Sequence, residues 1–394
     1  MTDMTQYLNK RLAKVKTSPI LTFSTFAKTI PHIVNFTVGE PDFNTPEHIK
    51  QAATTSIEHN RSHYAPSNGT PALKQATCQF LANKYQQHFN PNEIIITEGA
   101  SEGIYTAILS VLNPGDKAII PTPTFPLYID DVNLAGGQPI LVDTSKTGFK
   151  LTPQLLQTAL EQAGSDVRLL ILNYPSNPTG VTYSQAELHA LARVIKDQPI
   201  FVLCDEIYSE LNYDQPHASL VNELPDQTIL ITGLSKSHAM TGWRIGIMAA
   251  PKAITDELSK IHQFTITSTP TMIQDAAQEA LANGPDDALP MKQEYQRRRD
   301  YIVEHLNDLG FSCASPKGAF YVFAKIAPDL QQDDVEFAYD LAKNGLVAAV
   351  PGSYFGPGGQ HHLRFSYATS FDNIQQGMSN LTKYVAQQRA KKEQ

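Results

Sequence analysis

Short apolar runs alternate with stretches of helical spacing over most of the chain, and this alternation constrains the fold more than any other feature. The runs are Glu93–Thr97, Lys117–Pro121, Pro139–Asp143, Arg168–Asn173, Ile200–Cys204, Thr228–Thr232 and Ile245–Ala249. Between the first two, apolar residues recur from Ile104 to Val111 at the i, i+3, i+4 and i+7 positions of an amphipathic helix. Several runs are almost continuously apolar, as expected for strands covered on both faces. The pattern predicts an α/β domain built on a mostly parallel sheet.

The pattern of expected helices and strands changes after Asn283, which predicts a second, smaller α+β domain. It would contain a long helix over Asp286–Leu309, a strand over Ala319–Ala324, a helix over Val335–Asn344, two short strands and a terminal helix. Because 394 residues exceed one ordinary core, two domains are expected. We place an N-terminal arm and part of the small domain at 1–45, the large domain at 46–285 and the small domain at 286–394. The segment Thr17–Pro31 is predicted to be an extended arm lying against the rest of the protein.

Composition excludes several classes of protein. The 41% hydrophobic and 18% charged residues are typical of a globular protein, and the net charge of -8 argues against a nucleic-acid surface. Cys78, Cys204 and Cys313 fit no metal-ligand spacing and are expected to be reduced thiols. Residues 1–16 lack the apolar core of a signal peptide, and no stretch reaches the roughly 18 apolar residues of a membrane span. We therefore expect a cytoplasmic protein without a membrane anchor.

Polar residues follow the carboxyl ends of the predicted strands, where open parallel sheets bind ligands. Gly99, Ala100 and Ser101 open a helix whose free N–H groups could bind an anion, although many ordinary helices start this way. The loop 174–180 (YPSNPTG) holds two prolines and a glycine, which suggests that Asn177 has a fixed direction. A simple structural turn is the alternative for this loop.

The ends of the next two strands carry the residues with the strongest chemical meaning. Asp205 follows a buried strand and requires a cation or donors unless it caps a helix, and Tyr208 is a nearby phenol. Lys236 follows the strand Thr228–Thr232, where burial would lower its pKa and make it a nucleophile for a carbonyl. Arg244 could bind a phosphate through paired N–H donors. The alternative is a surface loop with two exposed cations.

The run Gly233–Gly246 (GLSKSHAMTGWRIG) fits the lysine motif of a known family position for position. Other motifs of the same family occur in the family's order along the chain: GEPDFNTP (39–46), YAPSNGTPALKQA (64–76), GASEGI (99–104), YPSNPTG (174–180), CDEIYSEL (204–211), GAFYVF (318–323) and LRFSYATS (363–370). From about residue 18 onward the chain resembles the class I and II (fold type I) pyridoxal 5'-phosphate-dependent aminotransferases. It is most similar to the N-acetyl-L,L-diaminopimelate and aromatic amino acid branch. The resemblance implies the pyridoxal-phosphate-dependent transferase fold.

The resemblance also implies how the cofactor would be held. Lys236 would form a Schiff base with pyridoxal phosphate and, once freed, move the substrate's α-proton. Asp205 would pair with the pyridine nitrogen, and Tyr208 and Asn177 would bind the ring's phenolic oxygen. Phe125 would stack on the ring, unless it is an ordinary core aromatic.

For the phosphate, the resemblance implies the N–H groups of Ala100 and Ser101, the side chains of Ser235 and Arg244, and Tyr64 from a partner subunit. Some relatives carry a serine where this chain has Gly233, so one phosphate donor could be missing or replaced. A homodimer with shared active sites is implied.

For the substrate, the resemblance implies that Arg364 binds the α-carboxylate as a bidentate fork, with help from the Gly39 amide. An amino acid and a 2-oxo acid would be the substrates, with glutamate and 2-oxoglutarate as the donor pair. The side-chain pocket is expected to involve Ile20, Leu21, Phe23, Tyr321 and Tyr354, with the arm around Ile20 as a lid.

Three other functions compete with an aminotransferase. A carbon–sulfur β-lyase would use the same cofactor and nearly the same residues, but the run Gly233–Gly246 favours transfer. A cofactor-binding regulator would need a DNA-binding module, whereas only about forty residues precede the matching core. A nicotinamide-dependent dehydrogenase is disfavoured because no G-x-G-x-x-G follows the first strand.

Overall fold

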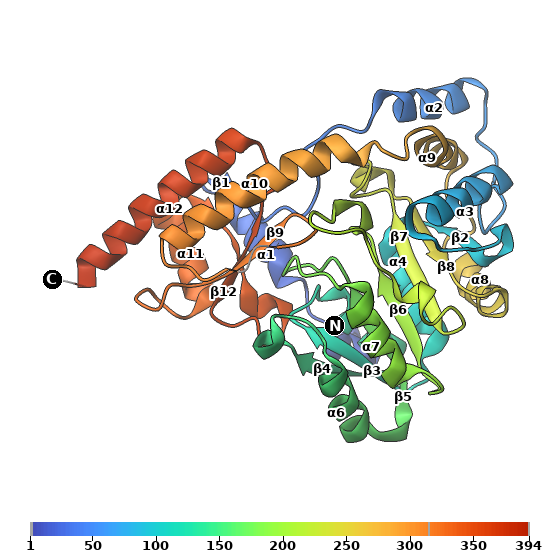
Figure 1. Cartoon of the computed structure of the whole chain (residues 1–394), viewed down its shortest axis with the longest axis horizontal. Helices are drawn as coiled ribbons and strands as arrows, with labels where there is room; N and C mark the ends of the chain where they lie inside the picture. The colour runs from blue at the N-terminus through green and yellow to red at the C-terminus, as the bar shows by residue number, and fades with distance from the viewer. Residues whose placement is uncertain (1–2, 314–315, 393–394) are drawn as a thin grey trace.

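A seven-stranded sheet forms the centre of the larger part of the molecule, with strand order β2-β8-β7-β6-β5-β3-β4 (Figure 1). The computed structural model describes residues 3–313 and 316–392. The strands are β2 Ile94–Thr97, β3 Lys117–Thr122, β4 Gln138–Asp143, β5 Val167–Asn173, β6 Phe201–Asp205, β7 Thr228–Gly233 and β8 Gly246–Ala249. β8 is antiparallel to both of its neighbours, β2 and β7, whereas the pairs from β7 through β4 are parallel. The predicted mostly parallel sheet is confirmed. Each predicted apolar run corresponds to a strand whose ends differ from the prediction by no more than a residue or two.

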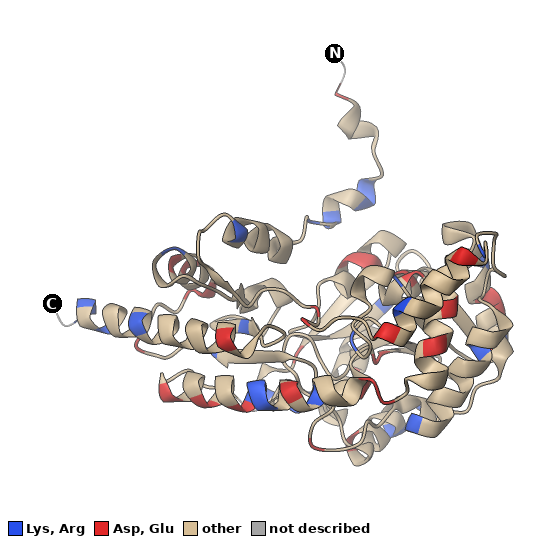
Figure 2. Ribbon diagram, turned by 90° about the horizontal axis from the view of Figure 1, so that it is seen from above, with Lys and Arg blue, Asp and Glu red and all other residues tan. Residues whose placement is uncertain are grey.

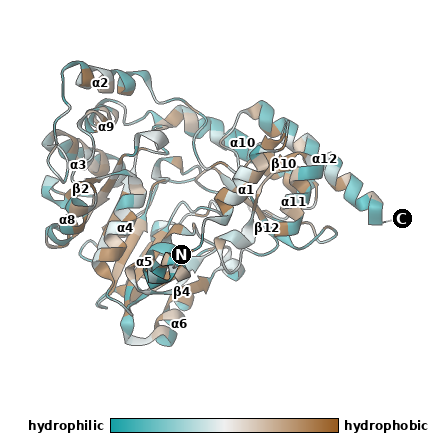
Figure 3. Ribbon diagram, turned by 180° about the vertical axis from the view of Figure 1, so that it is seen from behind, coloured by the Kyte–Doolittle hydropathy of each residue, from teal (hydrophilic) through white to brown (hydrophobic). Residues whose placement is uncertain are grey.

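Helices cover both faces of this sheet, and alternate residues of a strand pack against different helices. Ile94 and Ile96 of β2 lie in one apolar cluster with residues of α3 (Pro71–Tyr85) and α9 (Thr271–Asn283). Ile95 lies in another with residues of α4 (Gly99–Val111) and α5 (Leu127–Ala135). The other helices around the sheet are α2 (Glu47–Glu58), α6 (Pro153–Ala163), α7 (Gln185–Ile195) and α8 (Lys252–Ile266). In Figure 3 the strands are brown and lie between helices with teal outer faces, which explains why these strands read as continuously apolar.

The smaller part of the molecule combines both ends of the chain. Its antiparallel sheet has the order β11-β12-β9, formed by β9 (Tyr321–Lys325), β11 (Val350–Pro351) and β12 (His362–Ser366). The helices α10 (Ala288–Asp308), α11 (Asp334–Gly345) and α12 (Phe371–Lys392) pack around it (Figure 1). Near the N-terminus, β1 (Val34–Asn35) pairs in parallel with β10 (Val347–Ala348). The domain limits at residues 45 and 285 stay a prediction.

The expected extended arm over Thr17–Pro31 is wrong, because its centre is the helix α1 (Pro19–Lys28). The Ser18 hydroxyl caps the helix by accepting a hydrogen bond from the Leu21 N–H, and Pro19 occupies the first turn, where no N–H is needed. Phe23 and Ala27 are fully buried on one side. The segment does lie against the protein, but it satisfies its backbone internally.

The surface carries charges of both signs, with Lys and Arg interspersed among Asp and Glu on the outer helices (Figure 2). The N-terminal segment, with the 3-10 turns Met4–Tyr7 and Lys10–Lys14, extends from the body of the molecule. It is attached where the Arg11 guanidinium donates to the Leu134 carbonyl of α5 at 3.0 Å. Within residues 3–313 and 316–392, no helix is both long and apolar enough to cross a membrane.

Candidate active site

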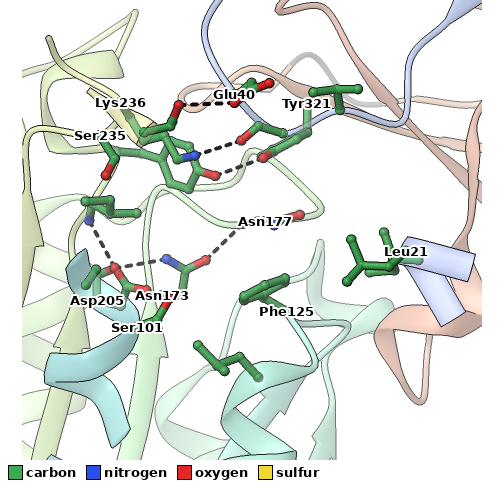
Figure 4. Close-up of a pocket in the computed structure, with 18 of the residues that line it drawn as sticks. Leu21, Glu40, Ser101, Phe125, Asn173, Asn177, Asp205, Ser235, Lys236 and Tyr321 are labelled. Carbon is green, nitrogen blue, oxygen red and sulfur yellow. Dashed lines mark hydrogen bonds between the residues drawn. The ribbon is translucent and has the colours of Figure 1, made fainter. Parts of the chain in front are cut away.

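A cavity of about 460 Å³ lies at the carboxyl ends of β5, β6 and β7, facing β9, β12 and α1 (Figure 4). The large sheet contributes Asn173 and Asp205 at strand ends, and α4 contributes its first turn. Tyr321 and Arg364 come from the small sheet, and the segment 37–40 runs along the cavity. This is the edge at which a parallel α/β sheet is expected to bind its ligand.

Asp205 is a buried carboxylate with two donors of its own. It is 4% exposed, accepts a hydrogen bond from the Tyr128 hydroxyl at 2.6 Å, and accepts one from the Ile207 N–H at 3.1 Å. Burial raises the pKa of Asp205 to about 6, while the hydrogen bonds from Tyr128 and Ile207 oppose that rise. A cation placed beside this group would complete its charge balance.

Lys236 projects into the cavity from the loop after β7. Its Nζ donates to the Gly39 carbonyl at 2.7 Å, as Figure 4 shows, and lies near the ring of Tyr208. Burial lowers the pKa of Lys236 to about 8, and the nearby Glu40 carboxylate opposes this effect. A lysine with such a pKa is partly uncharged near neutral pH and can act as a nucleophile or a base.

One end of the cavity is built to hold an anion. Ala100 and Ser101 lie in the first turn of α4, with Ser235 and Arg244 lining the same region. Gly99 has φ +75, and a Cβ there would lie 2.3 Å from Arg244 Nη2, so the glycine allows the guanidinium to approach the helix start. Free N–H groups and a guanidinium are the donors that proteins use for phosphates.

Gly233 has a structural reason to lack the side chain that some relatives carry. It pairs with Gly246 in the antiparallel ladder of β7 and β8, and a Cβ at Gly233 would lie 3.0 Å from the Ile245 carbonyl oxygen. A serine would require the neighbouring strand to shift. The anion-binding end therefore relies on its other donors.

At the opposite end, Arg364 is held rigidly and has a donor to spare. Its guanidinium donates from Nη1 to Asn177 Oδ1 at 2.9 Å and from Nη2 to the Thr37 carbonyl at 2.7 Å. The side chain is 3% exposed, and its Nε has no hydrogen-bond partner among the described residues. A buried donor without a partner is costly, so the arrangement fits a site for a bound carboxylate.

Two tyrosines connect the surroundings of Lys236 with those of Arg364. The hydroxyls of Tyr208 and Tyr321 lie 2.9 Å apart, and the Arg364 guanidinium lies 4.6 Å from the centre of the Tyr321 ring. A Cβ at Gly39 would lie 2.6 Å from the Tyr321 hydroxyl, which explains the glycine. Phe125 stands below Asn177 at the cavity wall (Figure 4).

The structure brings the predicted site residues together, except Tyr64. The cavity is lined by Gly39, Ala100, Ser101, Phe125, Asn177, Asp205, Tyr208, Ser235, Lys236, Arg244 and Arg364. Tyr64 is 88% exposed and does not line this cavity.

Among the residues expected to form the side-chain pocket, Ile20, Leu21 and Tyr321 line the cavity. Phe23 does not, since it lies in the core of the smaller part, and Tyr354 lies outside the lining. Sequence reasoning missed Tyr128, which lies on α5. Its position three residues after Phe125 was the only available signal.

A family model for aminotransferase class I and II matches residues 31–381 of the chain. The chain belongs to the class I and II aminotransferases. A Bacillus subtilis (strain 168) protein named "Probable N-acetyl-LL-diaminopimelate aminotransferase" is 42% identical over 98% of both chains. A solved aspartate aminotransferase from Thermus thermophilus with maleate has a TM-score of 0.90 at 32% identity, covering 95% of this chain and 99% of the other. An aromatic aminotransferase from Pyrococcus horikoshii has a TM-score of 0.87 at 33% identity, covering 93% and 99%.

These comparisons confirm the predicted family, fold and enzyme class of this aminotransferase. Because the relatives are named as aminotransferases, they favour amino-group transfer over carbon–sulfur cleavage or regulation. The family uses pyridoxal phosphate. The donor set of the cavity fits that group, because it combines an anion-binding end, a buried carboxylate and a lysine of lowered pKa.

Proposed function

We propose that this aminotransferase binds pyridoxal phosphate in the cavity and exchanges the amino group of glutamate with a 2-oxo acid of amino-acid biosynthesis. The observation that carries the proposal is the convergence of Lys236, Asp205 and Arg364 on one cavity. An amine nucleophile, a partner for a ring cation and a carboxylate fork are the groups that this reaction needs. A cytoplasmic location is part of this proposal.

The cofactor would be held from three directions. Its phosphate would lie on the N–H groups of Ala100 and Ser101, beside Ser235 and Arg244. Asp205 would face the ring nitrogen, and Phe125 would cover one face of the ring. When bound, pyridoxal phosphate supplies a reactive aldehyde carbon and a ring that withdraws electrons from the substrate.

The chain's own residues would then orient the substrate and move one proton. Arg364 would bind the α-carboxylate, because its guanidinium is already fixed by Asn177 and Thr37. Lys236 would remove the proton from the substrate's Cα, for which a pKa near 8 leaves an adequate unprotonated fraction. The contact between Tyr208 and Tyr321 would keep both phenols in place beside the reacting atoms.

The second substrate is proposed from the relatives. The name of the Bacillus subtilis protein points to an N-acetyl-diaminopimelate substrate, and the Pyrococcus horikoshii structure points to aromatic amino acids. Ile20 and Leu21 give the cavity an apolar side that either side chain could contact. A homodimer in which Tyr64 reaches the partner's phosphate site completes the proposal.

A visible absorption spectrum tests the proposed half-reactions. Purified protein loaded with pyridoxal phosphate should show a visible band that glutamate bleaches and 2-oxoglutarate restores. The Lys236→Ala variant should fold normally but lose this cycle, because it lacks the amine that binds the cofactor and moves the proton. A wild-type protein whose band does not respond to glutamate would exclude glutamate as the donor, and one that takes up no cofactor would refute the proposal.

A further inference from the structure

One face of α1 forms a wall of the cavity, opposite the residues that would hold the cofactor. Leu21, Ser24 and Lys28 line the cavity and recur at i, i+3 and i+7, so they share one helix face. Figure 4 shows Leu21 on α1 directed across the cavity toward Phe125. Along the helix axis, Leu21 and Lys28 are about 10 Å apart, at roughly 1.5 Å per residue. The face therefore offers an apolar stretch that ends in a cation.

Lys28 is the cation of this cavity to which the proposed function gives no role. The other cations have partners: Lys236 donates to the Gly39 carbonyl, Arg244 to the Thr241 carbonyl, and Arg364 to Asn177. Lys28 is exposed, and its ammonium makes no hydrogen bond or ion pair with residues 3–313 or 316–392. A solvated surface lysine would show the same lack of partners, so its position must decide its role.

The face of α1 is linked to Arg364 through a single residue, Thr37. The Thr37 hydroxyl donates to Ser24 Oγ at 2.9 Å, and the Thr37 carbonyl accepts from Arg364 Nη2 at 2.7 Å. Beneath the exposed face, Ile20 and Phe23 are 8% and 0% exposed and anchor the helix. Thr37 thus joins the face of α1 to the guanidinium, and a site that selects the length of a substrate needs its two binding groups to be connected in this way.

The negatively charged residue Glu40 lines the cavity beside Lys236. Glu40 accepts a hydrogen bond from the Thr241 hydroxyl at 3.1 Å and stands near Lys236 in Figure 4. Its carboxylate raises the pKa of Lys236 against the effect of burial. A second negative charge on a substrate would be repelled from this side, which leaves the face of α1 as its favourable place.

We propose that Lys28 binds the distal carboxylate of a long 2-amino dicarboxylic acid while Leu21 contacts the methylene groups between the two ends. The proposal rests on the proposed function, in which Arg364 binds the α-carboxylate of the same molecule. Lys28 is then a specificity-determining residue, and the substrate class is a dicarboxylate rather than an aromatic amino acid.

The test compares two amino acids of equal length, 2-aminopimelate and 2-aminoheptanoate, which differ only in the distal carboxylate. The rate of bleaching of the cofactor band gives kcat/KM for each half-reaction. Lys28→Met should lower the preference for 2-aminopimelate by at least about tenfold, as for a lost charge-assisted contact, and leave 2-aminoheptanoate unchanged. Lys28→Arg should retain the preference. An unchanged preference in Lys28→Met overturns the proposal.

Lys343→Met is the matched control, because Lys343 lies near α1 but outside the cavity, with its Nζ 5.8 Å from the Phe26 ring centre. It removes the same charge and should leave the preference unchanged. An equal loss in both variants would attribute the effect to net charge and overturn the role of Lys28.

A binding measurement separates this proposal from the proposed function. Pimelate and heptanoate lack the amino group, so calorimetry with the cofactor-loaded protein reports binding without any reaction. Wild type should bind pimelate at least about tenfold more tightly than heptanoate, and Lys28→Met should remove the difference. Selective pimelate binding without reaction of either amino acid would refute the transamination and support Lys28. Equal binding of both acids by the wild-type protein would refute Lys28 alone.

Discussion

At the scale of single residues, the charge state of Asp205 is a balance between burial and two hydrogen bonds. Burial favours the neutral acid, whereas the Tyr128 hydroxyl and the Ile207 N–H favour the carboxylate. Only the carboxylate can pair with a protonated ring nitrogen. Tyr128 is 1% exposed, so water has little room to replace its hydroxyl if it is removed. We therefore treat Tyr128 as a positioning residue for Asp205.

Replacing Tyr128 by phenylalanine should weaken cofactor binding in a pH-dependent way. Loss of the 2.6 Å hydrogen bond raises the pKa of Asp205 further above about 6, so more of the carboxyl is neutral at pH 7. The dissociation constant of pyridoxal phosphate should rise about tenfold at pH 7 and approach the wild-type value near pH 9. Quenching of the fluorescence of Trp243, the single tryptophan, measures it.

Tyr183→Phe is the control for that experiment, because it removes a buried phenol that accepts from the Leu151 N–H and does not contact Asp205. It should bind the cofactor as tightly as wild type at every pH. If Tyr128→Phe behaved in the same way, the hydrogen bond to Asp205 would have no role in cofactor binding.

The residues that could be predicted from the sequence are those that a strand end or a motif positions. Asp205 and Lys236 follow β6 and β7, and the sheet alone brings them to one edge. Tyr128 reaches Asp205 from α5 across 77 positions of sequence, a contact that depends on how a helix packs on the sheet. The contact of Arg364 with Thr37 spans 327 positions and was equally hidden. Contacts between such distant positions leave no pattern in the local sequence from which they could be predicted.

At the scale of elements, helices posed the harder problem for prediction. The strands of the large sheet were recognisable because burial on both faces makes them continuously apolar. The helix α1 was mistaken for an extended arm because Thr, Ser and Phe have modest helix propensity and Pro19 suggested a break. Its stability comes from burial of Phe23 and Ala27 instead. Tertiary packing therefore overrides the local preference in the element that lines the substrate side.

The helix α5 contains a buried acid, Asp131, that should make folding stability depend on pH. Asp131 is 5% exposed, and its Oδ2 has no hydrogen-bond partner among the described residues. Burial raises the pKa of Asp131 from 3.8 to about 7, with a smaller contribution from Asp130. Between these values the unfolded chain releases a proton that the folded protein keeps, so stability falls as pH rises from about 4 to 7.

Asp131→Asn should remove the loss of folding stability that wild type shows as pH rises. We expect the free energy of unfolding of the variant to exceed that of wild type by about 1–3 kcal/mol at pH 8 and by much less at pH 4. Urea denaturation of the cofactor-free protein at both pH values measures the difference. Asp372→Asn, at an exposed position of α12, should change little at either pH. A difference between Asp131→Asn and wild type that does not vary with pH would contradict the buried-acid explanation.

At the scale of the whole molecule, several apolar side chains remain exposed on the side of α2 and α8. Tyr64 is 88% exposed, Phe264 89% and Ile57 60%. The segment that carries Tyr64 is attached to α8, where His262 contacts the Ser67 carbonyl and Asn68 donates to Ser259. Exposed apolar residues that gather on one side of a protein mark an interface. This side fits the proposed homodimer, in which Tyr64 would enter the cavity of the partner subunit.

Mixed dimers can show whether Tyr64 acts across that interface. Tyr64→Ala alone should lower turnover at least about tenfold by removing a phosphate donor, and Lys236→Ala should abolish it. In a heterodimer of the two variants, one site has an intact Lys236 from its own chain and an intact Tyr64 from the other. It should therefore regain about half of the wild-type activity, since one of two sites is complete.

A heterodimer of Phe125→Ala with Lys236→Ala is the control, because it should not regain activity. Phe125 lines the cavity of its own chain, so each site of that heterodimer carries one lesion, and the activity should stay at the level of the variants. Differently tagged chains, purified as heterodimers and assayed with glutamate, allow both measurements. If the Tyr64 pair regained no more activity than the Phe125 pair, Tyr64 would act within its own chain, and the shared active site would be refuted even if the protein were a dimer.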